Sequence, residues 1–370
     1  MQRIKSVDVL RGLSIWIMVY GHMLQFWIRP EDFWLKYWLY AFLAPIGATG
    51  FLFISGVSAT LAYKSNLHTQ KVSMKTMRNT YLLRALFILI IALFFNLGVA
   101  MVFGGGDLTD IWSWNALQTI AISLLLTWPF LKKSKILRLS LATLAITFNQ
   151  ILLITLTPFN GQFNLYGIAY HILFNPIDTY VILNYYGIVL IGSVMGDYLY
   201  DLKNGDKLNK KEFLIKNRAI IYSIIIGIST TTFGILFFFP NFIIFNSVSS
   251  VLYALGLIIS FLAVNIVIEV LELIKTKKSH RFLYFYSFYS FTIFLGHNVL
   301  LLLFIDRLNA YFTIWVAVIA FNIILGWLLK TMHDKLGIRA SLKAGISILS
   351  AYLAMKIEKK DMVILKFKKI

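Results

Sequence analysis

Residues 3–29 read RIKSVDVLRGLSIWIMVYGHMLQFWIR, and this stretch decides the fold class. A basic, polar beginning is followed by about twenty mostly apolar residues, the length that a helix needs to cross the hydrocarbon core of a bilayer. Two ionisable residues, Arg11 and His22, interrupt the apolar run. Ionisable side chains are costly inside a membrane and usually mark a functional site. The stretch therefore predicts a membrane-spanning helix with a polar stripe.

The two ionisable residues fall on one face of this predicted helix. Their spacing corresponds to about three helical turns, so Arg11 and His22 lie on nearly the same side, roughly 16 Å apart along the axis. Ser14 and Gln25 belong to the same stripe. If the chain enters the membrane from the cytoplasm, Arg11 lies near the inner surface and His22 lies in the outer half of the bilayer.

Composition extends this interpretation to the whole chain. Of 370 residues, 59% are hydrophobic and 14% are charged, and the mean hydropathy is +0.76, values not expected of a soluble domain. We therefore predict an all-α polytopic membrane protein. The absence of cysteine excludes disulfides and thiolate nucleophiles. The formal charge of +19 comes from basic residues between apolar runs, which indicates topology signals and no nucleic-acid partner.

Hydropathy predicts about ten spanning helices. Their boundaries are taken from glycine, proline and clusters of charged residues. They lie near residues 8–28, 37–63, 79–102, 113–131, 136–156, 181–200, 219–239, 245–269, 282–304 and 310–330. Lysine and arginine are concentrated on alternate loops, near residues 64–78, 132–138, 203–218 and 275–281. The positive-inside rule then places both termini in the cytoplasm. We predict a multi-pass protein of the plasma membrane.

The C-terminal part of the chain is predicted to differ from the rest. We assign residues 1–337 to a ten-helix membrane domain and residues 338–370 to an interfacial helix followed by a basic cytoplasmic tail. The apolar stretch within 339–355 is short and is preceded by basic residues, which favours the membrane surface, although an additional span stays open.

The polar stripe of residues 3–29 suggests an acid–base and anion-binding role. A guanidinium keeps its charge and offers a fork of donors, so Arg11 is suited to holding a phosphate. His22 is suited to proton transfer because imidazole titrates near neutrality. The structural alternatives are that Arg11 extends to the lipid headgroups and that His22 makes a single interhelical hydrogen bond.

Other intramembrane polar residues fit the same site. His297, next to Asn298 in the ninth predicted helix, is expected at nearly the depth of His22, which suggests a common cavity. Arg84 lies about one turn inside the third helix, and Gln118 lies near the outer start of the fourth. We expect no metal, because no carboxylate or third histidine accompanies the histidines at that depth.

Several segments together resemble a known family. They are Ser6 to Gly12 with His22 following Arg11, Phe51 to Gly56, Leu83–Arg84, Asn115 to Gln118, Tyr186 to Gly192, and Ser290 to His297. In this order they resemble segments of the type 3 membrane acyltransferases and, more closely, of prokaryotic relatives of heparan-α-glucosaminide N-acetyltransferase. The resemblance covers most of the chain.

The resemblance implies an activity. It implies transfer of an acyl group, usually acetyl, from cytoplasmic acyl-CoA to a sugar, surface glycan or lipid-linked acceptor across the bilayer. By position, His22 would be the catalytic histidine and Arg11 would help to hold the donor. We add Arg84 and Ser14 as acyl-CoA-binding residues, and His297, Asn298, Gln25 and Gln118 as catalytic or acceptor-binding candidates.

Some alternatives stay open at this point. The animal enzymes place their histidine beyond the first helix, where this chain has Arg29 to Asp32, so the acceptor can be an amine or a hydroxyl. Direct transfer and an acyl-histidine intermediate are both compatible with the sequence, as is a homo-oligomer. The competing function is a proton-coupled transporter or lipid-linked-sugar flippase, although no inverted repeat and no matching pair of broken helices is found.

Overall fold

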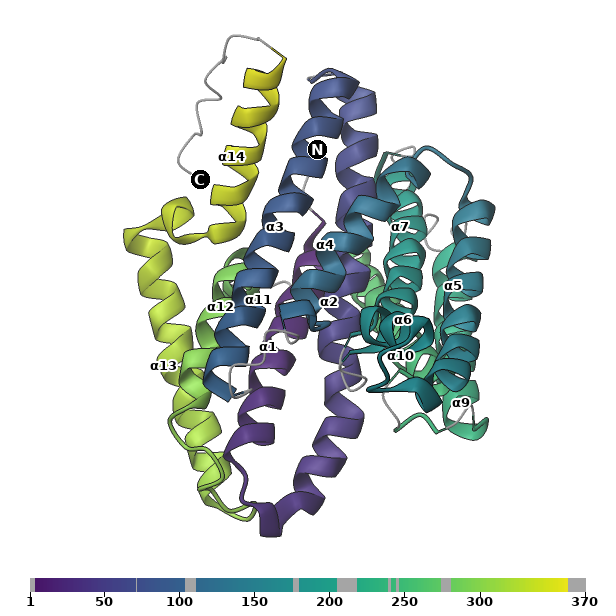
Figure 1. Ribbon diagram of the computed structural model, residues 1–370. Helices are drawn as coiled ribbons and strands as arrows, with labels where there is room; N and C mark the ends of the chain where they lie inside the picture. The colour runs from purple at the N-terminus through teal and green to yellow at the C-terminus, as the bar shows by residue number, and fades with distance from the viewer. Residues whose placement is uncertain are drawn as a thin grey trace.

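The computed structural model describes residues 4–70, 72–103, 111–175, 180–204, 218–238, 241–243, 246–273 and 281–358. These residues form helices, turns and one isolated β-bridge, between Ile28 and Leu308, and no strand occurs among them. Figure 1 shows long helices that run in roughly the same direction through the molecule. The prediction of an all-α protein is confirmed.

The helices follow the predicted order along the chain. The long ones are α1 (Lys5–Trp27), α2 (Phe33–Thr69), α3 (Met74–Phe103), α5 (Lys135–Leu156), α7 (Ile182–Asn204), α9 (Arg218–Leu236), α10 (Val248–Leu271) and α13 (Thr313–Lys335). The shorter ones are α4 (Ala116–Thr127), α6 (Leu165–Phe174), α11 (Arg281–Phe288), α12 (Ser290–Leu301) and α14 (Leu342–Ile357). Single 3₁₀ turns lie at Pro30–Asp32, Trp128–Phe130, Thr157–Phe159 and Gly337–Ala340.

Each of the ten predicted spans coincides with a helix or a pair of helices. Among the described residues, seven helices are long and apolar enough to cross a membrane, which makes this a multi-pass membrane protein. The other three predicted spans correspond to α4, α9 and the pair α11 and α12, which are shorter. The side of the membrane on which each terminus lies stays a prediction.

The ninth predicted span is divided into two helices. The chain leaves helical geometry at Tyr289, where φ is −95° and ψ is 17°, so α11 ends and α12 begins there. The Tyr289 hydroxyl donates to the Gly337 carbonyl oxygen at 2.9 Å and lies 3.3 Å from His333 Nδ1. The break therefore coincides with an attachment to the end of α13.

Helix α1 is held close to its neighbours by small residues. A Cβ atom at Gly12 would overlap the carbonyl oxygen of Leu283 on α11, so only glycine permits this approach.

The first turn of α1 is fixed by Glu269 of α10, whose carboxylate accepts from the backbone N–H groups of Lys5, at 3.0 Å, and Ser6, at 2.7 Å. A carboxylate satisfies the orphan donors of a helix N-terminus and complements its dipole. These contacts fix the position of Arg11 and His22.

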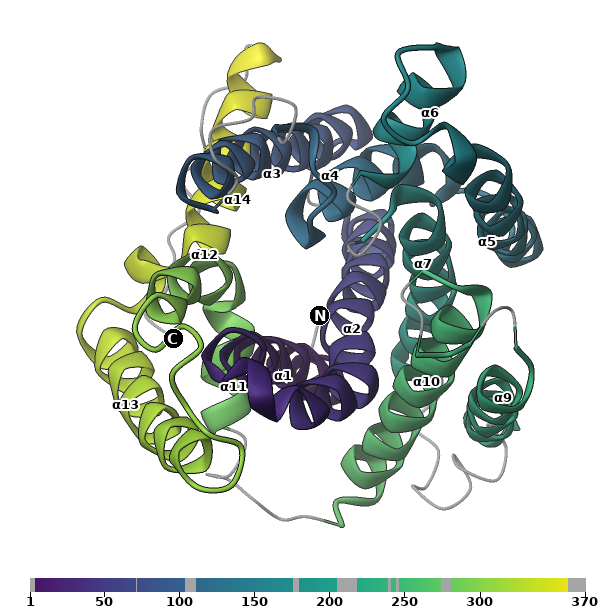
Figure 2. The same ribbon diagram turned by 60° about the horizontal axis from the view of Figure 1, so that its bottom comes forward.

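Helices far apart in the sequence surround the centre of the molecule. Figure 2 shows α1, α2, α4, α3, α12 and α11 arranged around it, with α5 and α9 outside this ring. Helix α14 runs alongside α3 (Figure 1) and packs against it. Glu358, just after α14, accepts from Thr76 Oγ1 at 2.7 Å and from Asn79 Nδ2 at 3.3 Å, both on α3. The predicted basic tail beyond Glu358 lies outside the described residues.

Candidate active site

Two histidines from opposite ends of the chain are in direct contact. His22 Nδ1 on α1 lies 2.8 Å from His297 Nε2 on α12. The rings are stacked, with centroids 5.1 Å apart and an interplanar angle of 13°. The structure thus brings together the two histidines that the sequence places at the same depth.

The hydrogen bonds around this pair define which nitrogen carries each proton. His297 Nδ1 lies 3.0 Å from the carbonyl oxygen of Ile293, which can only accept, so this nitrogen donates. In the neutral ring His297 Nε2 is then an acceptor, and His22 Nδ1 donates to it. His22 Nε2 therefore keeps its lone pair, which makes it the basic nitrogen of the pair.

The two rings differ in exposure. His297 is buried, with 2% of its surface exposed, and its edge packs against Phe294 with centroids 6.0 Å apart. His22 is only partly buried, and Phe26 packs edge-on against it at 6.5 Å. His22 is thus the more exposed histidine of the pair.

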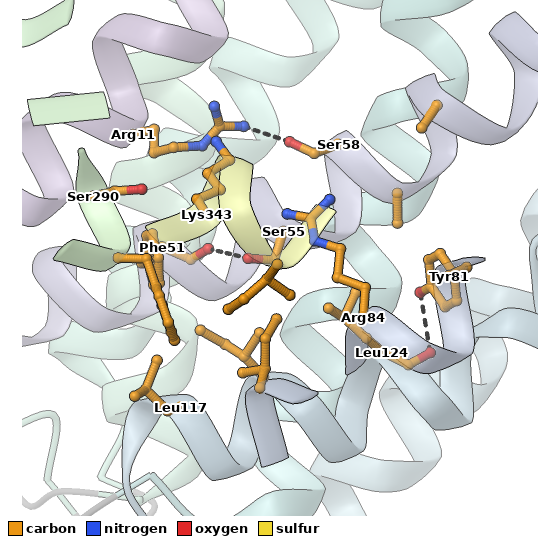
Figure 3. Close-up of a pocket in the computed structure, with 16 residues that line it drawn as sticks. Arg11, Phe51, Ser55, Ser58, Tyr81, Arg84, Leu117, Leu124, Ser290 and Lys343 are labelled. Carbon is orange, nitrogen blue, oxygen red and sulfur yellow. Dashed lines mark hydrogen bonds between the residues drawn. The ribbon is translucent and has the colours of Figure 1, made fainter. Parts of the chain in front are cut away.

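A pocket of about 170 Å³ lies nearer the N-terminal end of α1 than the histidines do. Its lining comes from α1, α2, α3, α4, α12 and α14 and includes three cationic side chains, Arg11, Arg84 and Lys343. Figure 3 shows these three around one part of the pocket, while Phe51 and Leu117 form another part. The pocket thus combines a cationic region with an apolar wall.

Arg11 is held by residues from three helices. Its Nη2 donates to Ser58 Oγ on α2 at 2.5 Å, and its Nη1 lies 3.4 Å from both Asp8 Oδ1 and Ser287 Oγ. Ser287 Oγ also donates to Asp8 at 3.2 Å. The carboxylate of Asp8 offsets part of the charge of Arg11, and the contacts orient the guanidinium toward the pocket.

Arg84 has a different environment. Within the described parts of the chain its guanidinium makes no hydrogen bond and no ion pair, although it lines the pocket. Neighbouring Tyr81 donates to the Leu124 carbonyl oxygen at 3.0 Å, which joins α3 to α4 (Figure 3). A cation without a counter-charge in such a site favours binding of an anion.

The remaining predicted site residues lie away from the pocket lining. Ser14 is fully buried, and a Cβ atom added at Gly50 would overlap its Oγ, so its place is in the contact between α1 and α2. Asn298 Nδ2 donates to the Phe294 carbonyl oxygen of its own helix at 2.8 Å. Gln25 is half-buried one turn beyond His22. The expected contact of Ser14 with acyl-CoA stays a prediction.

Gln118 belongs to a buried amide cluster. Its Oε1 accepts from Asn96 Nδ2 at 2.9 Å, and its backbone N–H donates to Asn115 Oδ1 at 2.9 Å. Its Nε2 is buried and makes no hydrogen bond with the described residues. The motif Asn115 to Gln118 thus forms the N-cap of α4, and the NH₂ group of Gln118 stays available to donate.

Some residues of the pocket were missed by sequence reasoning. Lys343 lies in the segment predicted to form an interfacial helix, and a linear pattern does not show that α14 packs against α3. Ser58 and Tyr81 carry no charge and stand in ordinary helical patterns. No group of three histidine, aspartate or glutamate side chains that could hold a metal occurs among the residues described.

Comparison with known proteins identifies the family of the chain. The family described as "Heparan-alpha-glucosaminide N-acetyltransferase, catalytic" matches residues 3–212, which is more than half of the chain. The chain belongs to this family. A comparison with curated proteins finds no match.

Family membership identifies the chain as a membrane acetyltransferase in the general sense. The part that matches the heparan-alpha-glucosaminide N-acetyltransferase family covers α1 to α7 and contains Arg11, His22 and Arg84. His297 and Lys343 lie beyond it. The site therefore combines side chains from the matched part with side chains from the C-terminal third of the chain.

Proposed function

We propose that this protein transfers an acyl group, with acetyl the expected one, from cytoplasmic acyl-CoA to a sugar or surface glycan on the outer side of the plasma membrane. The observation that carries the proposal is the position of two sites along α1. The cationic pocket surrounds Arg11, and the histidine pair lies about 16 Å further along the same helix. That separation suits the extended pantetheine arm of CoA, which joins the phosphates to the reactive thioester.

The pocket supports binding of the donor. Arg11 and Arg84 present guanidinium groups, which match phosphate oxygens with two parallel hydrogen bonds. Phe51, Ile88 and Leu117 provide apolar surface for the pantetheine arm. We assign the phosphates to the cationic region and the acyl end to the neighbourhood of His22.

The histidine pair supports the chemical step. His22 Nε2 takes the proton from the acceptor hydroxyl or amine as that group attacks the thioester carbonyl carbon. The carbon–sulfur bond then breaks, and the departing CoA thiolate takes the proton from His22. His297 stabilises the intermediate imidazolium, because its Nε2 accepts the hydrogen bond from His22 Nδ1. Direct transfer needs no enzyme nucleophile, in agreement with a chain that has no cysteine.

Amide side chains are the proposed acceptor-binding groups. Gln25 lies one turn beyond His22, toward the predicted outer side, and Asn298 follows His297. Gln118 offers a buried Nε2 group that has no partner among the described residues. Amides both donate and accept, as the hydroxyl groups of a sugar require.

Mass spectrometry of surface glycans tests the proposal in cells. Cells with the protein should carry an acyl group on a glycan that cells without it lack. Equal acylation in both would contradict the proposal, and loss of the glycan itself from the surface would favour the competing flippase function.

A further inference from the structure

We infer that Lys343 binds a phosphate of the acyl donor, so that helix α14 is part of the donor site and restricts the donor to phosphorylated acyl carriers. The inference rests on the proposed function and deepens it. Lys343 lies outside the part of the chain that matches the family, residues 3–212. It is nevertheless one of three cations that line the pocket.

The beginning of α14 is fixed to α11 and α12. The Ser341 hydroxyl donates to the Phe288 carbonyl oxygen at 3.1 Å and accepts from the backbone N–H of Ala344 at 3.4 Å. Thr292 Oγ1 donates to the Ala340 carbonyl oxygen at 3.1 Å and accepts from Leu342 N–H at 3.1 Å. Lys343 thus stands in the first turn of a helix whose start is held against the pocket wall.

The other end of α14 is attached to α3, the helix that carries Arg84. Glu358 accepts from Thr76 and Asn79, as described above. Ile346, one turn after Lys343, lines the same pocket, whereas Lys356 near the end of the helix is exposed. One face of α14 therefore closes the pocket, and Lys343 belongs to that face (Figure 3).

The charges in the pocket indicate the class of ligand. The lining contains Arg11, Arg84 and Lys343 and, among the described residues, no carboxylate. Asp8 forms an ion pair with Arg11. Cationic side chains that converge on one pocket attract ligands of opposite charge. A ligand with several negative charges, such as the phosphates of CoA, fits this arrangement better than a single carboxylate does.

The test compares three variants with two donors. Lys343→Met removes the charge, Lys343→Arg keeps it, and Lys356→Met removes an exposed charge from the same helix. Acetyl-CoA carries the phosphates, and acetyl-pantetheine lacks them. The protein is held in phosphatidylcholine nanodiscs, so that no anionic lipid headgroup competes for the pocket.

We expect Lys343→Met to raise the KM for acetyl-CoA about tenfold or more, since a charge-assisted hydrogen bond is lost. The kcat with acetyl-CoA, and the KM for acetyl-pantetheine, should stay close to those of the wild type. Lys343→Arg should retain most of the affinity, and Lys356→Met all of it. An unchanged KM in Lys343→Met, or an equal rise for both donors, would overturn the inference.

Thermal stabilisation by CoA separates this inference from the proposed function, because it requires no turnover. CoA should stabilise the wild type and Lys356→Met more than pantetheine does, and this difference should shrink in Lys343→Met. If CoA stabilises in this way but no acyl transfer occurs, the proposed activity fails and the phosphate site stands. If CoA stabilises wild type and Lys343→Met equally, the inference fails whatever the activity is.

Discussion

His22 and His297, 275 residues apart in the chain, lie with His22 Nδ1 2.8 Å from His297 Nε2. Because His297 Nδ1 is occupied by the Ile293 carbonyl oxygen, the pair can form this hydrogen bond in only one direction when both rings are neutral. His297 thus sets the tautomer of His22 and leaves His22 Nε2 free to accept a proton.

Replacing His297 should impair the chemical step more than substrate binding. His297→Leu removes the acceptor for His22 Nδ1, so we expect kcat to fall about 10- to 100-fold while the KM for acetyl-CoA changes little. His297→Gln keeps an acceptor and should retain more activity than His297→Leu. Steady-state kinetics of the two variants, with His68→Ala at the exposed end of α2 as a control, check this expectation. Equal loss in both variants would argue for a purely structural role.

Replacing Arg84 should weaken binding of the donor. Arg84→Met removes a guanidinium that has no counter-charge among the described residues, so the KM for acetyl-CoA should rise about tenfold. Arg78→Met is the matched control, because Arg78 is exposed on the same helix and hydrogen bonds to its neighbour Asn79. Titration of each variant with CoA measures the affinity. Comparable losses in the two variants would show that Arg84 has no specific role.

Replacing Gly12 should destabilise the protein at the contact between α1 and α11. A Cβ atom there would overlap the Leu283 carbonyl oxygen, and overpacking of this kind typically costs about 1–3 kcal/mol. We expect Gly12→Ala to lower the thermal denaturation temperature. Gly21→Ala on the same helix should not, since nothing lies within 4 Å of a Cβ atom at Gly21. Similar denaturation temperatures for the two variants would mean that α1 can shift without loss of stability.

The helices could be predicted from the sequence because apolar length reports directly on membrane spans. The shared depth of His22 and His297 could also be predicted, because the position of a residue along a helix follows directly from the sequence. The break at Tyr289 could not be predicted, because it depends on contacts with residues at the end of α13. Neither could the position of α14, because hydrogen bonds to Thr76 and Thr292, far away in the sequence, determine where this helix lies.

Ser14 illustrates the limit of periodicity in a different way. It lies on the same stripe of α1 as Arg11, and its contact with acyl-CoA stays a prediction. The stripe, however, is wide enough to meet two neighbours, and Ser14 meets Gly50 of α2. A helical pattern gives the direction of a side chain, but the neighbouring helix decides whether a cavity or a packed contact lies there.

Acyl transfer by His22→Ala tests the central claim most directly. Wild type and variant are reconstituted in proteoliposomes with radiolabelled acetyl-CoA on the predicted cytoplasmic side and a glycan fraction from the cell envelope on the other. The account predicts that label reaches the glycan with the wild type and that the rate falls at least about 100-fold with His22→Ala, while binding of CoA is retained. Undiminished transfer by His22→Ala would contradict it.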